Sequence, residues 1–220
     1  MNFFVNQFLP IFPIVVLWLV YICSLIAYFK KEWLGRFANL KMLLIFTAAF
    51  RVFYVSLLSV TQYYVWSHAE LTKLLVNSPI SPEVPLSNFL HKNLSFILDS
   101  RFGYIVFYSW GHFWISVLLT IAISSLFYAF LKALEKYNDR FFREGETELG
   151  FLLAMIVGWP NFIIFIPLVF VSVVLVSIFR GLYFKEAYTT LGVPMLLGAL
   201  TTMIFGSYLI ELLQLTVFKI

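Results

Sequence analysis

Long apolar runs with few or no charges recur along this chain, and they constrain its fold more than any other feature. A run of about 18 such residues is long enough to cross a bilayer as a helix. Hydrophobic residues make up 62% of the sequence and charged residues 12%, whereas a soluble domain carries about 25% charged residues. Because hydrocarbon leaves every backbone polar group to be satisfied internally, we expect an all-α, polytopic helical membrane protein whose surroundings are the lipid bilayer.

Five stretches are apolar and long enough to cross, namely residues 11–29, 42–66, 104–131, 161–179 and 192–213. Residues 149–157 are apolar too, but at about 1.5 Å per residue they are too short to cross untilted. They lead into Gly158-Trp159-Pro160, so residues 149–179 form either a short hairpin (a re-entrant pair) or one long span. We therefore expect about five to six membrane segments in a single membrane domain, 1–220. The polar residues 67–101 are predicted to form an external loop with a short amphipathic interfacial helix at 86–98.

The basic residues predict the orientation, because Lys and Arg are enriched in cytoplasmic loops. If residues 30–41 and 132–148 are cytoplasmic and 149–179 is a hairpin, 10 of the 15 basic residues are cytoplasmic and four are external. The ten are Lys30, Lys31, Arg36, Lys41, Lys132, Lys136, Arg140, Arg143, Arg180 and Lys185. The amino terminus is then external, in a multi-pass protein of the plasma (inner) membrane.

Charge and cysteine content exclude several classes of function. The net charge of +4 is explained by the loop asymmetry, so no nucleic-acid partner is expected. The single cysteine, Cys23, allows neither an intrachain disulfide nor a cysteine-cluster zinc site. We expect no metal and no cofactor.

An acidic motif precedes the short apolar stretch. It reads Gly-Glu-Thr-Glu-Leu-Gly-Phe from Gly145, and the stretch closes at Gly158-Trp159-Pro160-Asn161. This pattern resembles the second catalytic region of type IV prepilin peptidases, in which a Gly-x-Gly-Asp-x-Lys-Leu motif opens a short helix that ends in Gly-Trp or Gly-Trp-Pro. The resemblance places the family's aspartate at Glu146 and its lysine at Glu148.

The same resemblance continues downstream and covers about residues 145–213. Residues 190–194, Thr-Leu-Gly-Val-Pro, followed by Gly198 and Gly206, are similar to the family's Ile-Pro-Phe-Gly-Pro-Phe region and its small-residue helix. Residues 104–220 would then be a prepilin-peptidase-like part, and residues 1–103 the amino-terminal spans with the external loop. Gly192, Gly198 and Gly206 are expected to allow close helix approach.

That family cuts prepilin leaders with two aspartates on the cytoplasmic side. Asp99 precedes Ile105 by six residues and imitates the motif of the first aspartate, but one span between Asp99 and Glu146 sends them to opposite faces. They cannot form a dyad that shares a proton, and the family's zinc-binding cysteine pairs are absent. An active enzyme would use Glu146 as general acid/base, with an acidic partner on its own side. The candidates for that partner are Glu144, Glu148 and Asp139.

Glu146 and Glu148 also have a purely structural interpretation. Acids at a helix start favour its positive end by about 0.3–1 kcal/mol, and Glu146 and Glu148 can serve that purpose alone. Whether the chain is an enzyme therefore stays open.

A second, shorter resemblance lies in the amino-terminal half. Residues 49–55 and 100–108 are similar to the Gly-x-Arg-Leu-x-Tyr-Val-Leu segment of prolipoprotein diacylglyceryl transferases. It implies a lipid-handling transferase in which Arg51 and Arg101 bind an anionic head group, since guanidinium matches phosphate geometry.

Arg51 also has structural interpretations: it can pair with a polar group on another span, such as Glu211, or snorkel to the interface. Because a charge inside a span is costly, we expect it to contact an acidic or amide side chain, backbone carbonyls of another helix, or a lipid phosphate.

Three classes of function follow from the sequence. The first is a divergent prepilin-peptidase-like integral membrane protein, with a prepilin-like peptide as partner if activity survives. The second is the lipid-handling transferase, with a lipid substrate. The third is a non-catalytic scaffold subunit of a membrane assembly.

Overall fold

A computed structural model describes residues 8–29, 39–80, 88–137, 142–183 and 189–218, with the side chains of residues 88–91 excepted. Over these residues the fold is all-α, with 87% helix and no strand, which confirms the predicted fold class. Several residues of the orientation argument and one acidic candidate lie outside the described residues: Lys30, Lys31, Arg36, Asp139, Arg140 and Lys185.

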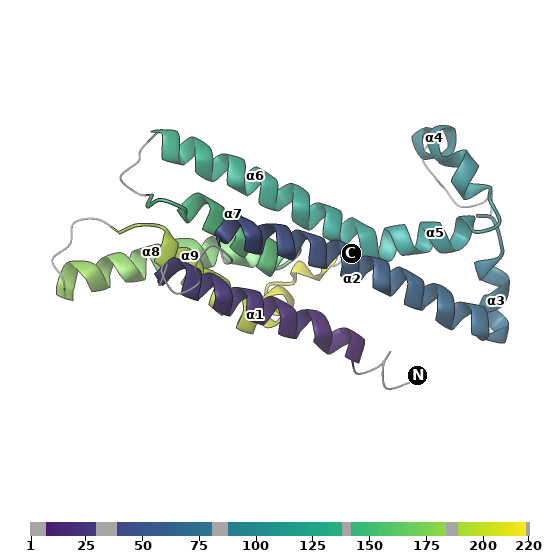
Figure 1. Cartoon of the computed structure of the whole chain (residues 1–220), viewed down its shortest axis with the longest axis horizontal. Coiled ribbons are helices and arrows are strands. Elements are labelled where there is room, and N and C mark those ends of the chain that lie inside the picture. The colour runs from purple at the N-terminus through teal and green to yellow at the C-terminus, as the bar shows by residue number, and fades with distance from the viewer. Residues whose placement is uncertain (1–7, 30–38, 81–87, 138–141, 184–188, 219–220) are drawn as a thin grey trace. The chain divides into compact units, whose positions relative to one another are not determined.

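The elements follow one another as helices with short connections (Figure 1). In chain order they are α1 (Leu9–Phe29), α2 (Leu40–His68), α3 (Glu70–Val76), α4 (Asn88–Leu98), α5 (Gly103–Ser109), the π-helix η3 (Trp110–Trp114), α6 (Ile115–Tyr137), α7 (Glu146–Val157), α8 (Phe162–Tyr183), α9 (Gly192–Leu212) and the 3-10 helix η5 (Leu215–Phe218).

Five helical stretches within the described part of the chain are long and apolar enough to cross a membrane. They are Leu9–Phe29, Leu40–His68, Gly103–Tyr137, Phe162–Tyr183 and Gly192–Leu212. Each contains one of the five predicted spans almost completely, which confirms a multi-pass membrane protein. The short apolar stretch is also a helix, α7, of 12 residues.

The helices divide into two compact units, with the division inside α2 after Arg51 and near the start of α6 before Val117. Unit 1 contains Met1–Arg51 and Val117–Lys219, and unit 2 contains Val52–Ser116 with the last residue, Ile220. Each unit is described separately below.

The core of unit 1 is built around α7. Ten of its residues are buried, including Leu149, Leu152, Leu153 and Ala154 at 0% exposure. Side chains from α1, α6, α8 and α9 pack around this helix. A helix that is apolar on every side is stable only when other elements surround it.

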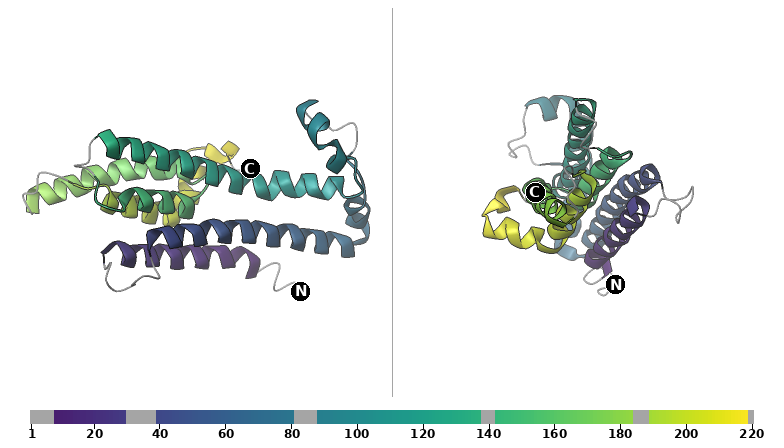
Figure 2. Two further views of the ribbon diagram at one scale, coloured as in Figure 1. Left: turned by 45° about the horizontal axis from the view of Figure 1, so that its top comes forward. Right: turned by 90° about the vertical axis from the view of Figure 1, so that its left-hand side faces the viewer.

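The chain reverses direction between α7 and α8. A Cβ on Gly192, at the start of α9, would lie 2.5 Å from Oε1 of Glu146, at the start of α7. A Cβ on Gly206, further along α9, would lie 3.0 Å from Oδ1 of Asn161, in the turn that follows α7. Thus α7 and α9 run in the same direction in contact with each other, and α8, which connects them along the chain, runs in the opposite direction (Figures 1 and 2). Of the two alternatives for residues 149–179, the structure has the hairpin.

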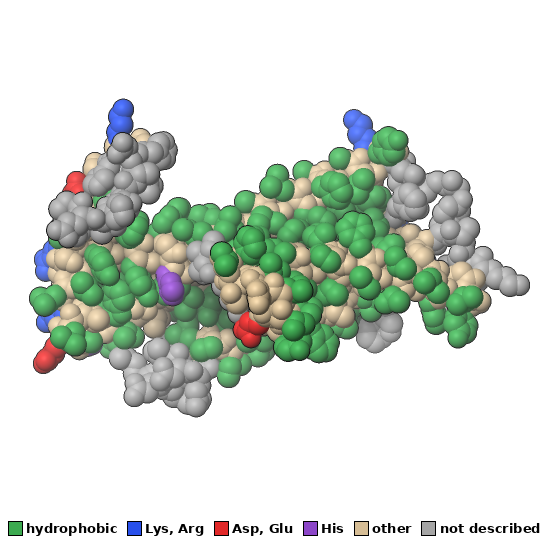
Figure 3. Space-filling view, turned by 180° about the vertical axis from the view of Figure 1, so that it is seen from behind, with side chains coloured by type: hydrophobic (Ala, Val, Ile, Leu, Met, Phe, Trp, Pro, Cys, Tyr) green, Lys and Arg blue, Asp and Glu red, His purple; other side chains and the backbone are tan. Residues whose placement is uncertain are grey.

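The described surface is that of a protein surrounded by hydrocarbon. Large apolar side chains are exposed on the candidate spans, among them Ile45 at 62%, Leu126 at 70% and Phe170 at 65%. On the face shown in Figure 3, hydrophobic side chains cover most of the described surface and charged ones are few. Contiguous apolar surface of this kind is not tolerated in a water-soluble monomer.

In unit 2 the helix predicted at residues 86–98 is present as α4, and α3 is a helix that the sequence did not predict. The expected external loop is therefore partly helical. Next to α5, the π-helix η3 carries His112, whose ring stacks on Tyr108 with centroids 5.2 Å apart. The indole of Trp114 donates a hydrogen bond to Oγ of Ser59 on α2 at 3.2 Å.

Candidate functional site

The acidic motif forms the start of α7. Gly145 precedes the helix with φ of +89°, a left-handed conformation that favours glycine. Its carbonyl accepts the first helical hydrogen bond, from the N–H of Leu149 at 2.9 Å. Glu146 and Glu148 then occupy the first turn, where the positive end of the helix favours acids.

Glu146 is completely buried, at 0% exposure, and both of its carboxylate oxygens accept hydrogen bonds. The hydroxyl of Tyr28, near the end of α1, donates to Oε1 at 2.7 Å. The backbone N–H of Arg143 donates to Oε2 at 3.1 Å. Gly192 closes the site from the side of α9, where any larger residue would collide with Tyr28 and Glu146. We call these residues (Tyr28, Arg143, Glu146 and Gly192) the Glu146 cluster.

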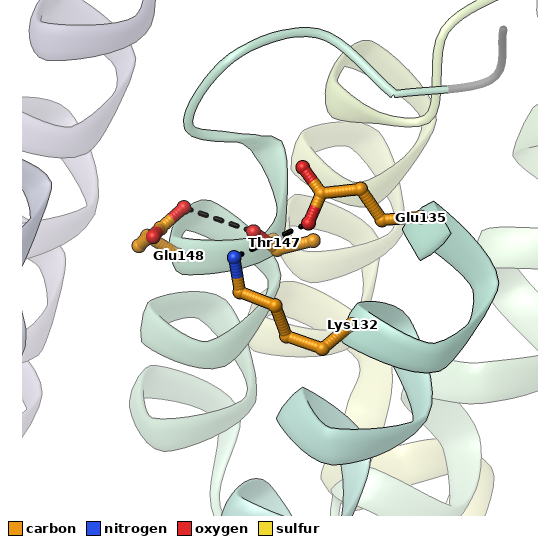
Figure 4. A network of polar contacts seen from close by, with 4 residues as sticks. All are labelled: Lys132, Glu135, Thr147 and Glu148. Atoms are coloured by element: carbon orange, nitrogen blue, oxygen red, sulfur yellow. Dashed lines mark hydrogen bonds and ion pairs between the residues drawn. The ribbon is translucent and has the colours of Figure 1, made fainter. Parts of the chain in front are cut away.

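Glu148 lies beside Thr147 and faces the region of Lys132 (Figure 4). Its Oε2 accepts a hydrogen bond from the hydroxyl of Thr147 at 2.9 Å, and α6 brings Lys132, paired with Glu135 at 3.2 Å, to the same region. Burial raises the pKa of Glu148, but hydrogen bonds from its own backbone N–H and from Thr147, with the charges of Lys132 and Lys41, outweigh burial and lower it. Glu148 is therefore held as a carboxylate at neutral pH.

The two hydrogen bonds to the Glu146 carboxylate come from a phenol and a backbone N–H, and neither partner is a carboxylate. Residues two apart on a helix do not face each other, so Glu148 and Glu146 diverge. Glu144 is exposed in the turn before α7. Asp99 is exposed and belongs to unit 2, and the expectation that it does not pair with Glu146 stays a prediction.

The other end of α7 is occupied by Arg51, from α2. Its Nε donates to the carbonyl of Met155 at 2.7 Å, and its Nη2 donates to the carbonyl of Ile156 at 3.0 Å. The last carbonyls of any helix lack an intrahelical partner, and a cation is favoured at that negative end. Of the contacts predicted for Arg51, the structure has the backbone carbonyls of another helix.

The turn after α7 is shaped around the guanidinium of Arg51. Gly158 has φ of +67°, and a Cβ there would lie 2.5 Å from Nη2 of Arg51. The next N–H, of Trp159, donates to Oγ1 of the buried Thr120 on α6 at 2.9 Å. The Trp159 indole donates to the carbonyl of Phe218 at 2.9 Å. Groups on α2, α6 and η5 thus form hydrogen bonds with the end of α7 and the turn that follows it.

Arg101, the second basic candidate, belongs to unit 2. It is exposed, and its Nε donates to Oδ1 of Asn77 at 3.1 Å. Among the described residues, no group of three or more His, Cys, Asp or Glu side chains could hold a metal ion.

Tyr28 and Thr120 were not identified from the sequence. Each lies within an apolar span, where a single hydroxyl carries no periodic or motif signal. Their partners lie 118 and 39 residues away along the chain, so only the folded arrangement reveals their roles.

Comparison of the chain with protein-family models, curated proteins and solved structures finds no match.

Proposed function

We propose that this chain is a divergent, prepilin-peptidase-like integral membrane protein that acts without catalysis, as a scaffold subunit in the membrane. The observation that supports this proposal is the state of Glu146, which has no exposed surface and accepts hydrogen bonds on both carboxylate oxygens. A carboxylate in this state is an anchor for α7.

The chemistry of peptide hydrolysis argues in the same direction. An aspartyl peptidase needs two carboxylates about 3 Å apart that share a proton and activate a water. The partners of Glu146 are a phenol and a backbone N–H, and neither can share a carboxyl proton in this manner. The extra methylene of a glutamate also exceeds the roughly 0.5 Å tolerance of a catalytic constellation.

Arg51 likewise has a structural use that competes with lipid chemistry. The guanidinium lies at the carbonyl end of α7, where its Nε and Nη2 already donate to backbone carbonyls. The geometry therefore favours the scaffold over the lipid transferase.

A peptidase assay on four proteins tests the proposal: the wild type, Glu146→Gln, Glu146→Asp and Tyr28→Phe. Each is purified in detergent and incubated with a prepilin-like peptide, and products are analysed by mass spectrometry. We expect no cleavage by any of them, including Glu146→Asp, which restores the residue type of the family. Thermal unfolding of the same samples should show a loss of stability in Glu146→Asp, whose shorter side chain does not reach both donors.

Cleavage by the wild type that disappears in Glu146→Gln, while the thermal midpoint of that variant stays at the wild-type value, would contradict the proposal. The isosteric amide keeps the shape of the site and removes its acid, so this outcome would assign Glu146 a catalytic role.

A further inference from the structure

The α7–α8 turn, residues 158–161, is non-helical backbone deep inside unit 1. Arg51, which binds at the end of α7, lies roughly 16 Å along α2 from the start of that helix at Leu40. Asn161, the last residue of the turn, lies beside Gly206 of α9, which is roughly 21 Å from the start of α9. Because the hydrocarbon core of a bilayer is about 30 Å thick, both residues lie at the depth of hydrocarbon.

Part of the Arg51 guanidinium has no partner in the protein. Of the five N–H donors of an arginine, the bonds to the α7 carbonyls use those of Nε and Nη2. Nη1 forms no hydrogen bond with any residue that the structure describes. In the same part of the chain, every fully buried side-chain nitrogen or oxygen has a partner. Nη1 is therefore open to the surroundings of the helices.

The side-chain amide of Asn161 is in the same state. The backbone carbonyl of this residue accepts hydrogen bonds from the N–H groups of Ile164 and Phe165, both at 3.0 Å. The amide itself bonds to none of the described residues, and Asn161 is partly exposed. Since no buried amide there lacks a partner, this one is open as well. Two unpartnered polar groups thus flank a single turn.

Hydrocarbon is an unfavourable medium for both groups. Non-helical backbone at membrane depth is tolerated only where protein buries it or where it lines a water-filled cavity. A charged side chain within a span faces the protein interior or such a cavity. Trp159, Pro160 and Asn161 are all partly exposed, so protein does not bury the turn. The alternative that satisfies these groups is water.

The packing of α7 indicates the side from which water arrives. The middle of α7, between the turn and the Glu146 cluster, is buried on every side, so no path follows that helix. Beyond the turn the protein is more polar. The Trp159 indole binds the carbonyl of Phe218 in η5, and the polar side chains of Gln214 and Thr216, next to and within η5, are exposed.

We propose that water enters unit 1 from the end opposite the Glu146 cluster and fills a polar vestibule that ends at the α7–α8 turn. Water there gives Nη1 of Arg51 its acceptor and gives the Asn161 amide its partners. In the predicted orientation the vestibule opens to the external side. This inference goes beyond the scaffold proposal, because Glu146 takes no part in it.

Two positions at about the same depth provide a matched test. Asn161 lies beside Gly206, and Phe205, the neighbour of that glycine in α9, is an apolar residue with 53% exposure. Asn161→Cys places a thiol at the polar turn, and Phe205→Cys places one on an exposed apolar surface. Each is made in a Cys23→Ser background, and size-exclusion chromatography checks that the proteins remain folded.

A membrane-impermeant thiol reagent is added to intact cells and, separately, to inside-out vesicles. We expect Asn161→Cys to react about tenfold or more faster than Phe205→Cys, because the thiolate is the reactive form and apolar surroundings suppress it. The reaction should occur from the side on which Ser78→Cys reacts, since residues 67–101 are predicted to lie at the end opposite the Glu146 cluster. Labelling after denaturation confirms that each thiol is present.

Asn161→Leu gives an independent readout in phospholipid nanodiscs. An amide in hydrocarbon without a partner is costly, whereas an amide in water is not. If water reaches the turn, Asn161→Leu should therefore not raise the thermal midpoint above that of the wild type.

Three results would overturn the proposal. The first is equal labelling of Asn161→Cys and Phe205→Cys, and the second is labelling of Asn161→Cys only from the side on which Asn138→Cys reacts. The third is a clear rise of the thermal midpoint in Asn161→Leu, which would place the amide in hydrocarbon.

Discussion

Single polar side chains in unit 1 lie at the two ends of one buried helix. Glu146 occupies the amino-terminal end of α7, and Arg51 binds the carbonyls at its carboxy-terminal end. In hydrocarbon an unmatched backbone group costs several kcal/mol. Of the contacts expected for Arg51, the structure has the backbone carbonyls of another helix, here those of Met155 and Ile156.

The first prediction concerns Arg51→Leu, which leaves the carbonyls of Met155 and Ile156 without their donors. We expect the free energy of unfolding in detergent to fall by about 1–3 kcal/mol, the usual cost of unsatisfied buried groups. The isolated α2 segment should insert into membranes more readily, because an arginine at a helix centre costs about 2.5–3.5 kcal/mol on insertion scales. Unfolding and insertion assays measure the two effects.

Ile45→Leu, at a residue 62% exposed on the same helix, is the matched control and should change neither quantity much. An Arg51→Leu protein as stable as the wild type would show that the two hydrogen bonds contribute nothing.

At the scale of elements, α8 and α9 pack closely where Gly198 of α9 faces Val169 of α8. A Cβ on Gly198 would lie 2.7 Å from Cγ2 of Val169 and 3.1 Å from its backbone N and Cα. Backbone atoms cannot move aside as a flexible side chain can, so this contact fixes the distance between the two helices. The expected packing role of Gly198 is confirmed.

The second prediction compares Gly198→Ala with Gly181→Ala. The first should destabilise the protein by about 1–3 kcal/mol, as overpacking of a core does. The second should be neutral or stabilise by up to about 1 kcal/mol, because a Cβ on Gly181 meets nothing within 4 Å and alanine favours helix. Thermal unfolding in detergent compares them, and equal effects would contradict the packing argument.

The spans were predictable because each one is a continuous apolar run, so composition within a window of residues suffices. The start of α7 was predictable for the same local reason, from a glycine and two acids. The side chains that bind at the two ends of α7 were not predictable. Tyr28 and Arg51 reach α7 across 118 and more than 100 residues, and no local pattern encodes such a pairing. Sequence therefore indicated Glu146 and Arg51 as unusual without revealing what each binds.

At the scale of the whole molecule, the remaining prediction is its orientation in the membrane. Unit 1 brings the ends of α1 and α6 together with the starts of α7 and α9, through Tyr28 with Glu146 and Gly192, and Lys132 near Glu148. The described parts of the two basic segments, residues 39–41, 132–137 and 142–148, therefore lie at one end of this unit. Both segments are rich in Lys and Arg, which are enriched on the cytoplasmic side. Their location at the same end is what the predicted orientation requires.

We expect that end to be cytoplasmic and the amino terminus external. Single cysteines at positions 78 and 138, in place of Ser78 and Asn138 and in a Cys23→Ser background, test this by labelling with an impermeant reagent on intact cells. Ser78→Cys should react and Asn138→Cys should be protected. The reverse pattern would invert the topology.

The long sequence separation between Arg51 and its carbonyls has a consequence for biogenesis. Chains are synthesised from the amino terminus at about 5–20 residues per second, and Met155 follows Arg51 by 104 residues. The second span is therefore synthesised roughly 5–20 seconds before the carbonyls that bind the Arg51 guanidinium. During that interval the guanidinium depends on water, lipid phosphate or the insertion machinery. The two carbonyls that bind Arg51 become available only once Met155 and Ile156 have been synthesised.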